Sequence, residues 1–268
     1  MIDYQIAIPS YDRAEVCQTK TLATLREMGV DADRVTVFVA DEAEKEIYDQ
    51  QFNGDWRTVV AELGIFKARR FINAHYAEGT RILSIDDDMK GFIEKRGKST
   101  QPYLGTITDL AQEGFAHCEA AAGKLWGIHP TENGFFMKDY TVVGLRYIGA
   151  GMFGSYAGDP VFLGRRPQQS SGEDFETSLR SFLMYGKVVR LEYLGWSTAN
   201  FAKGGIDSEL QTYGITDRAN DHTRALIDIA SRFPELAKTY KKSGNVTNLR
   251  LKSITLAKIP RHAGAVVL

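Results

Sequence analysis

RILSIDDD, residues 81–88, is a short apolar run that ends in three consecutive aspartates. An apolar run of this length, bounded by polar residues, predicts a buried β-strand. Charged residues directly after such a strand lie at the carboxyl edge of a sheet, where open α/β folds bind their ligands. The triplet Asp86, Asp87 and Asp88 is therefore the first candidate for a functional site.

Strands and helices alternate along the residues before this triplet. The pattern predicts strands over 4–9, 35–40 and 57–60, and helices over 12–28, 41–52 and 65–76. Such alternation predicts an α/β protein, with a mainly parallel, Rossmann-like sheet and helices on both of its faces. The strand ends at 9–11 and 40–42 are then expected at the same edge as the triplet.

The rest of the chain follows a looser pattern. It predicts helices over 109–124 and 173–185, glycine-interrupted strand structure over 141–153, a strand over 187–195 and helices toward the C-terminus. We expect one globular unit, in which residues 1–205 form the main domain and residues 206–268 form a mostly helical, basic extension packed on it.

The composition excludes several classes of protein. The chain has 268 residues, of which 43% are hydrophobic, and no apolar run approaches the length of roughly 20 residues that crosses a membrane. Cys17 and Cys118 lack metal-ligand spacing, so neither a disulfide framework nor a zinc site is predicted. We expect a soluble, cytoplasmic protein with no membrane contact and no evident protein partner.

Positive charge gathers near the C-terminus although the formal net charge is only -1. From Arg218 onward ten basic residues stand against three acids, an excess of seven. This excess fits a polyanionic partner, and it fits a solvated helical surface equally well.

The triplet itself favours a divalent cation. Three adjacent carboxylates repel one another, and Mg²⁺ or Mn²⁺ relieves that cost while preferring oxygen ligands. In an extended segment Asp86 and Asp88 lie on one side and Asp87 on the other. Two alternatives are an acidic turn that caps the next helix and a phosphotransferase of the haloacid dehalogenase type. The second is disfavoured because Met89-Lys90 follows the triplet and three strands precede it.

A second acidic pair, Glu173 and Asp174, opens a predicted helix. A carboxylate brought into the cleft there can serve as a general base. Helix capping is the alternative, because Ser170 with Glu173 and Ser171 with Asp174 both have capping-box spacing.

The combination of these motifs resembles the glycosyltransferases of the GT-A fold. More closely, it resembles phage glycosyltransferases that are associated with TET/JBP-type dioxygenases and glycosylate hydroxymethylpyrimidines in DNA. The resemblance is densest over 6–92, returns at 172–190, and is indistinct over much of 95–140 and the C-terminal part. It rests on the motifs IPSYDR (8–13), TLATL (21–25), VFVADEAE (37–44), GIFKARRFI (64–72), EGTRILSIDDDMKGF (78–92) and GEDFE (172–176).

The resemblance implies a role for each matching residue. Asp86 and Asp88 hold Mn²⁺ or Mg²⁺. A histidine is a further ligand, and of the two candidates, His222 and His262, His222 is the one chosen. Asp174, beside Glu173, is the catalytic base. The donor is a nucleotide-diphosphate sugar, most simply a UDP-sugar. Its nucleotide meets Pro9, Ser10, Tyr11 and Arg13, with Asp41 near the base or ribose and Asp87 near the ribose or sugar. One of Lys67, Arg69 and Arg70 offsets the diphosphate charge, and Arg70 is the residue chosen.

The implied reaction moves a sugar to the hydroxyl of 5-hydroxymethylcytosine or a related base in DNA, with inversion, in the host cytoplasm for a phage-encoded chain. Alternatives are a saccharide, lipid or protein acceptor, or a DNA-binding module without catalysis. A nucleotidyltransferase fits less well, since its glycine-rich basic signature is replaced here by Pro9–Arg13.

Overall fold

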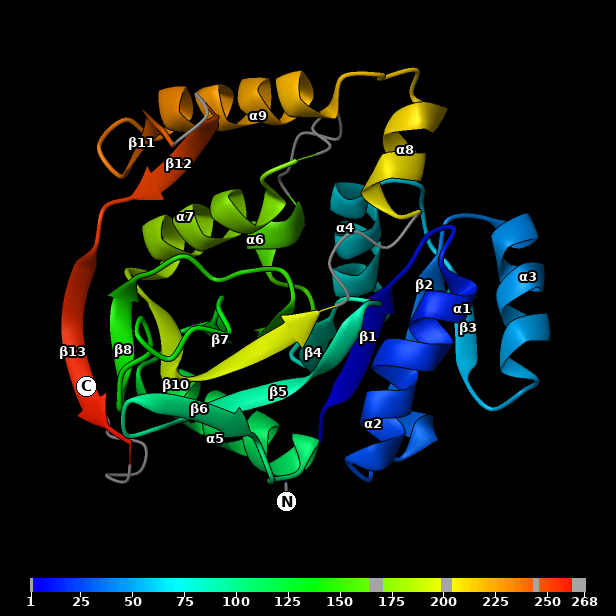
Figure 1. Ribbon diagram of the computed structural model, residues 1–268, viewed down its shortest axis with the longest axis horizontal. Coiled ribbons are helices and arrows are strands. Elements are labelled where there is room, and N and C mark those ends of the chain that lie inside the picture. The colour runs from blue at the N-terminus through cyan, green and yellow to red at the C-terminus, as the bar shows by residue number, and fades with distance from the viewer. Residues whose placement is uncertain (1, 164–170, 199–203, 243–245, 262–268) are drawn as a thin grey trace.

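The computed structural model describes residues 2–163, 171–198, 204–242 and 246–261. Its central sheet contains β1 (Gln5–Pro9), β2 (Val35–Val39), β3 (Arg57–Val60), β4 (Arg81–Ile85), β7 (Trp126–His129), β8 (Tyr140–Leu145), β9 (Met152–Tyr156), β10 (Val188–Thr198) and β13 (Ile254–Pro260). The spatial order is β13-β8-β10-β7-β9-β4-β1-β2-β3 (Figure 1). Among these nine described strands β8 and β9 run against the others, so the sheet is mostly parallel in direction.

A hairpin extends the sheet beside the acidic triplet. It consists of β5 (Met89–Arg96) and β6 (Ser99–Pro102), and β5 pairs antiparallel with β10. The chain therefore leaves β4, turns through the triplet and enters β5 directly.

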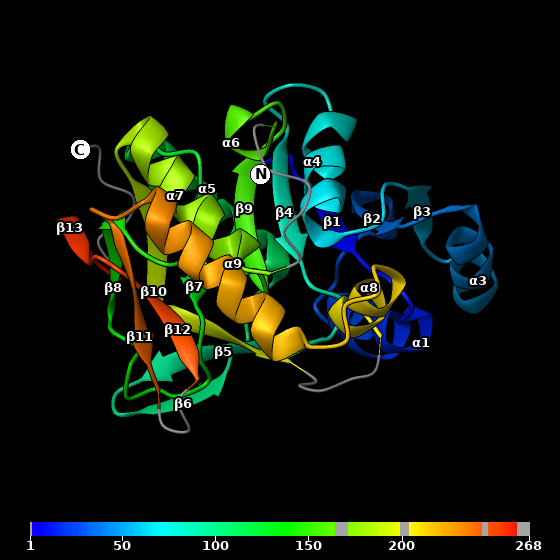
Figure 2. The same ribbon diagram turned by 90° about the horizontal axis from the view of Figure 1, so that it is seen from above.

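Helices cover both faces of the sheet (Figure 2). They are α1 (Ala14–Cys17), the π-helical turn η1 (Gln18–Leu22), α2 (Ala23–Glu27), the short η2 (Ala32–Arg34), α3 (Glu42–Phe52), α4 (Ile65–His75), α5 (Ile107–Ala120), α6 (Pro160–Leu163), α7 (Glu173–Tyr185), α8 (Ile206–Thr212) and α9 (Arg218–Arg232). On β1, Ile6 and Ile8 pack in the core shared with α2, α3 and α5, while Ala7 between them packs with Ile72 of α4. This alternation explains why the strand is apolar throughout.

The predicted elements of the first 90 residues are confirmed, with boundaries that differ by one or two residues. Asp41 begins α3 as predicted, since its side chain accepts a hydrogen bond from the Glu44 backbone nitrogen at 2.9 Å. The helix at 173–185 and the strands near 141–153 and 187–195 are also present.

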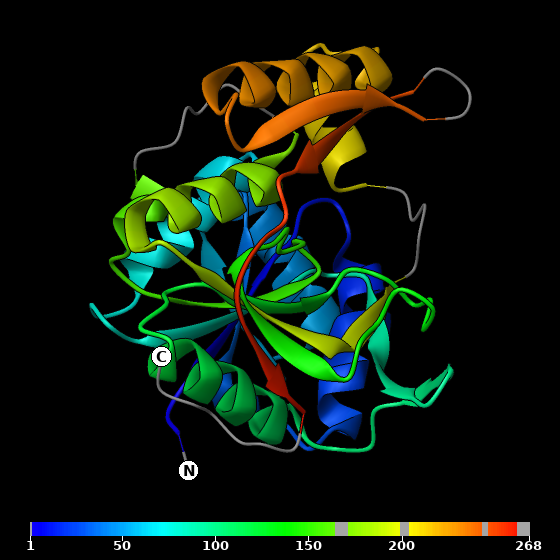
Figure 3. The ribbon, with the colours of Figure 1, turned by 90° about the vertical axis from the view of Figure 1, so that its left-hand side faces the viewer.

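The predicted C-terminal helices are present as α8 and α9, whereas the strands over residues 237–260 were not predicted. After α8 and α9 the chain forms β11 (Ala237–Lys241) and β12 (Thr247–Leu251), which pair with each other, and then β13, which pairs with β8 of the central sheet. Figure 3 shows α9 and the β11–β12 ribbon as a layer outside α7. Leu226 and Ile229 of α9 pack with Leu179 of α7, so the extension shares a core with the main domain.

None of the described helices combines the length and apolar character needed to cross a membrane.

Candidate active site

The acidic triplet forms the turn between β4 and β5, at the carboxyl edge of the sheet. Thr21, in the π-helical turn, closes the base of this turn: its hydroxyl donates to the Asp86 carbonyl at 2.7 Å and accepts from the Met89 backbone nitrogen at 2.9 Å. Single π-helical turns within α-helices are frequent at functional sites. The helix after β1 thus fixes the backbone that carries the three carboxylates.

Asp87 points toward the loop that follows β1. The Ser10 hydroxyl donates to its carboxylate at 2.6 Å, and the Arg13 guanidinium lies 3.2 Å from its other oxygen. Arg13 also lies 3.7 Å from Asp88. Ser10, Arg13 and Asp87, all predicted on the nucleotide side, are therefore in contact, and Pro9 is buried at the end of β1 just before them.

The simple alternation predicted for the triplet does not hold. Asp87 and Asp88 share Arg13, whereas Asp86 pairs with Arg69 at 2.9 Å. The physical reason is the backbone, because Asp87 and Asp88 form a turn instead of continuing the strand.

Tyr48 of α3 is part of this network and was not predicted from the sequence. Its hydroxyl lies 2.8 Å from the Ser10 hydroxyl and accepts a hydrogen bond from the Arg13 backbone nitrogen at 3.0 Å. Its ring is fully buried. Tyr48 therefore fixes the loop of residues 10–13 against α3.

Glu173 and Asp174 occupy the first turn of α7, opposite the triplet. The helix begins after Gly172, which has φ 80° and provides no side-chain cap. The capping alternative for Ser171 and Asp174 is thus not supported, and Ser170 lies outside the described residues. Glu173 instead pairs with Arg69 at 2.7 Å.

Arg69 joins the two acidic elements. It is 2% exposed and contacts Asp86, Glu173 and the Ser84 hydroxyl. The predicted arginine, Arg70, does not take part: it pairs with Glu62 at 2.9 Å on the half-exposed side of α4. Adjacent helical residues point about 100° apart, so only one of them faces the sheet.

Asp174 is held by Tyr147, whose hydroxyl donates to its carboxylate. The Phe175 backbone nitrogen donates to the other oxygen at 2.8 Å. Burial and the neighbouring Glu173 raise the pKa of Asp174 to about 6, although the Tyr147 hydrogen bond opposes the shift. Asp174 is therefore anionic near neutral pH and basic enough to accept a proton.

The acidic cluster, which we define as Asp86, Asp87, Asp88, Glu173 and Asp174, holds more negative charge than its two arginines offset. Burial raises the pKa of Asp86 to about 7, and it also raises the pKa values of Asp87 and Asp88. A divalent cation relieves such crowding. Among the described residues no three His, Cys, Asp or Glu side chains form a complete metal site, so oxygens of a ligand would have to complete the shell.

Three further predicted residues lie away from the cluster. Tyr11 contacts Thr212 of α8 at 3.2 Å, and Asp41 is exposed at the start of α3. His222 lies on α9, at the wall of a pocket that also contains Tyr147, and it makes no described contact with Asp86 or Asp88. His262 lies outside the described residues.

Arg69 gives a stability prediction. Arg69→Met is expected to lower the free energy of unfolding by about 3–5 kcal/mol, because Glu173 and Asp86 then lose their buried partner. Arg70→Met is the matched control and should cost at most about 1 kcal/mol, since its pair with Glu62 is half exposed. Urea unfolding at pH 7 measures both, and equal losses would contradict the role given to Arg69.

No protein-family model matches the sequence, and no curated protein matches it. Solved structures do resemble the fold. Glucosyl-3-phosphoglycerate synthase from Mycobacterium tuberculosis, in complex with Mn²⁺, UDP-glucose and phosphoglyceric acid, superposes with a TM-score of 0.53 at 13% identity, over 97% of this chain and 89% of that one. This chain has a GT-A fold. The same synthase with glycerol 3-phosphate gives a TM-score of 0.52. Residues 1–349 of TarS from S. aureus match at a TM-score of 0.46 and 14% identity, over 72% of this chain and 60% of that fragment.

Proposed function

We propose that this protein is a metal-dependent glycosyltransferase that moves a sugar from a nucleotide-diphosphate sugar, a UDP-sugar, to the hydroxyl of 5-hydroxymethylcytosine or a related hydroxymethylpyrimidine in DNA. One observation carries the proposal: in a GT-A fold, the carboxylates after β4 face those that open α7, and Arg69 joins them. The resemblance to phage enzymes and the absence of a membrane-crossing helix among the described residues fit action in the cytoplasm.

The donor lies on the side of β1 in this proposal. Ser10 and Arg13 line the nucleotide, and Asp87 approaches the ribose or sugar. Asp86 and Asp88 would hold Mn²⁺ or Mg²⁺, and the metal would supply Lewis-acid stabilisation of the leaving diphosphate. The dense negative charge of the cluster supports this assignment.

The acceptor hydroxyl lies on the side of α7. Its oxygen forms a bond to the anomeric carbon while the bond from that carbon to the diphosphate oxygen breaks, and Asp174 accepts the hydroxyl proton. Tyr147 orients the Asp174 carboxylate for this transfer. Attack from the face opposite the leaving group inverts the anomeric centre.

DNA as acceptor rests on the family resemblance and on the basic C-terminal part. Several of its cations are already paired: Arg232 with the buried Glu176, Arg261 with the buried Glu94, and Arg218 with Asp207 at the surface. Lys238, Arg250 and Lys252 stay exposed. The charge available to a polyanion is therefore smaller than the sequence count, and it lies along β11, β12 and the residues after them.

The proposal is tested by incubating the protein and Mn²⁺ with a panel of nucleotide sugars and either hydroxymethylated or unmodified DNA. Digestion and mass analysis of the nucleosides should show a hexose or pentose gain confined to the hydroxymethylated base, lost in EDTA. Donor turnover without DNA modification would favour a saccharide, lipid or protein acceptor. Absence of any donor turnover would favour a binding module.

A further inference from the structure

A pocket of about 470 Å³ lies next to Asp174, and none of the described residues that line it belongs to the proposed donor site. Its walls come from the end of β8, the first turn of α7, helix α9 and the strand β12 with the residues after it. Two of its residues adjoin the proposed base: Tyr147 donates a hydrogen bond to Asp174, and Phe175 follows it in the chain. A ligand in this pocket therefore contacts two residues that hold or adjoin Asp174.

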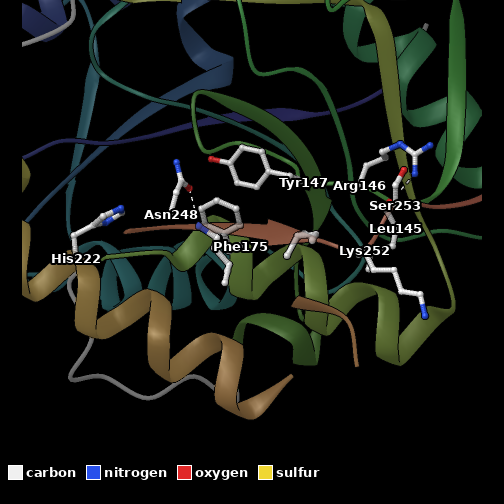
Figure 4. Close-up of a pocket in the computed structure, with 10 residues that line it drawn as sticks. Leu145, Arg146, Tyr147, Phe175, His222, Asn248, Lys252 and Ser253 are labelled. Carbon is white, nitrogen blue, oxygen red and sulfur yellow. Dashed lines mark hydrogen bonds between the residues drawn. The ribbon is translucent and has the colours of Figure 1, made fainter. Parts of the chain in front are cut away.

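The pocket has a different chemistry at each end (Figure 4). His222 and Asn248 lie at one end, the rings of Tyr147 and Phe175 in the middle, and Arg146 with Lys252 at the other end. The two rings stack with centroids 4.3 Å apart. None of the ten described residues that line the pocket is acidic.

The positive end is fixed in place. The Arg146 guanidinium donates to the Leu145 and Ile254 carbonyl oxygens at 2.8 and 2.9 Å, and its Nε lies 3.6 Å from the buried Glu192 carboxylate, which offsets part of its charge. Lys252 is exposed beside it. At the opposite end, burial and the nearby Arg218 lower the pKa of His222, so its imidazole is a neutral hydrogen-bonding group at pH 7.

A basic surface continues from this pocket along the β11–β12 ribbon. Lys238 and Arg250 stand directly opposite each other in the antiparallel register, where like charges repel, and a bound anion would offset that repulsion. The Arg250 guanidinium also lies over the Tyr240 ring, 4.8 Å from its centroid. Arg250 and Asn248 are two residues apart on β12, so their side chains share one face. The face that carries Lys238 and Arg250 thus adjoins the pocket wall formed by Asn248.

We infer that this pocket binds the acceptor as a nucleotide unit extruded from a nucleic acid strand, with neighbouring phosphates on the Lys238–Arg250 face. The planar base lies against the Tyr147–Phe175 wall, its polar edge meets Asn248 and His222, and its phosphate faces Lys252 and Arg146. Bases removed from a stack are bound in this way by aromatic and hydrogen-bonding side chains. The inference deepens the proposed function and rests on it for the role of Asp174.

A free nucleotide presents the same ring and phosphate, and a sugar phosphate presents the phosphate alone. The Lys238–Arg250 face distinguishes these ligands, because only a strand longer than one nucleotide reaches beyond the pocket. We therefore measure binding without donor or metal, by fluorescence anisotropy with a labelled hydroxymethylated DNA duplex. Competition with hydroxymethyl-dCMP and with glucose 6-phosphate provides the two other arms.

Lys252→Gln and Phe175→Leu should each weaken binding of both the duplex and hydroxymethyl-dCMP, on the order of tenfold for loss of the stacking ring. The double variant Lys238→Gln/Arg250→Gln should weaken the duplex alone and lower the slope of log affinity against log salt by about 2. Lys98→Gln, an exposed lysine in the β5–β6 turn, is the matched control and should change neither. Thermal melting checks that Phe175→Leu stays folded.

Duplex binding that Lys252→Gln and Phe175→Leu leave unchanged would overturn the inference, as would competition by glucose 6-phosphate but not by hydroxymethyl-dCMP. Nucleotide binding with no loss of duplex affinity in the double variant would assign the pocket to a free nucleotide and overturn the nucleic acid part. The binding assay contains no donor, so its result does not depend on sugar transfer. If the variants bind as expected but the protein transfers no sugar in the separate activity assay, the proposed function is contradicted and the pocket assignment stands.

Discussion

Asp88→Ala is expected to lower donor turnover by on the order of a thousandfold, because a metal at a developing diphosphate charge contributes several kcal/mol to transition-state stabilisation. Asp88 is one of two carboxylates proposed to hold that metal, and its partner Asp86 is already paired with Arg69. Without Asp88 the metal would be held by the Asp86 carboxylate alone, and Asp86 already shares its charge with Arg69. Turnover is measured as release of nucleoside diphosphate over a Mn²⁺ titration.

The fold is expected to survive this change. Asp88 contacts Arg13 at the longer distance of 3.7 Å, and burial raises its pKa, so its removal relieves charge crowding. The melting temperature should therefore stay the same or rise. Asp55→Ala removes an exposed carboxylate paired with Arg26 and is the matched control, with full turnover expected. Full activity of Asp88→Ala, or activity undiminished by EDTA, would rule out the metal assignment.

The elements of the first 90 residues could be predicted from the sequence because the signals for them are local. Short apolar runs, helix-start residues such as Asp41 and the acidic triplet after β4 all act within a few residues, and alternation then fixes the parallel sheet. The triplet and Glu173-Asp174 were expected to share a cleft only through the family resemblance. In the structure Arg69 links them.

The remaining residues depend on contacts that are distant in sequence. Arg69 shares a helical face with Phe66 and Asn73, both buried, and this spacing was the available signal against Arg70. Tyr147 lies between glycine-interrupted strands, so no period marks its direction. The strands β11 and β12 form a two-stranded ribbon whose outer face is polar, and β13 is an edge strand that ends at Pro260, so each lacks the apolar run of a central strand.

Asp174→Asn is expected to lower kcat by about 10²- to 10⁴-fold, the range that a positioned general base contributes. The amide keeps the size of the side chain, so α7 and the Tyr147–Phe175 stack should persist. Asp174 must be deprotonated to act, and its pKa is raised to about 6. The rate should therefore be level near pH 7.5 and fall about tenfold for each unit below pH 6.

Tyr147→Phe tests whether the fall in rate below pH 6, the acid limb of the pH profile, is caused by protonation of Asp174. The Tyr147 hydroxyl donates to the charged carboxylate and so lowers its pKa. Without this bond the pKa of Asp174 rises and the limb moves to higher pH, whereas a limb from a distant group would not move. The pH profile of kcat for the wild type, Tyr147→Phe and Asp174→Asn measures this shift. If the acid limb does not move in Tyr147→Phe, or if it persists in Asp174→Asn, another carboxylate is the base. Tyr147 then contributes only packing.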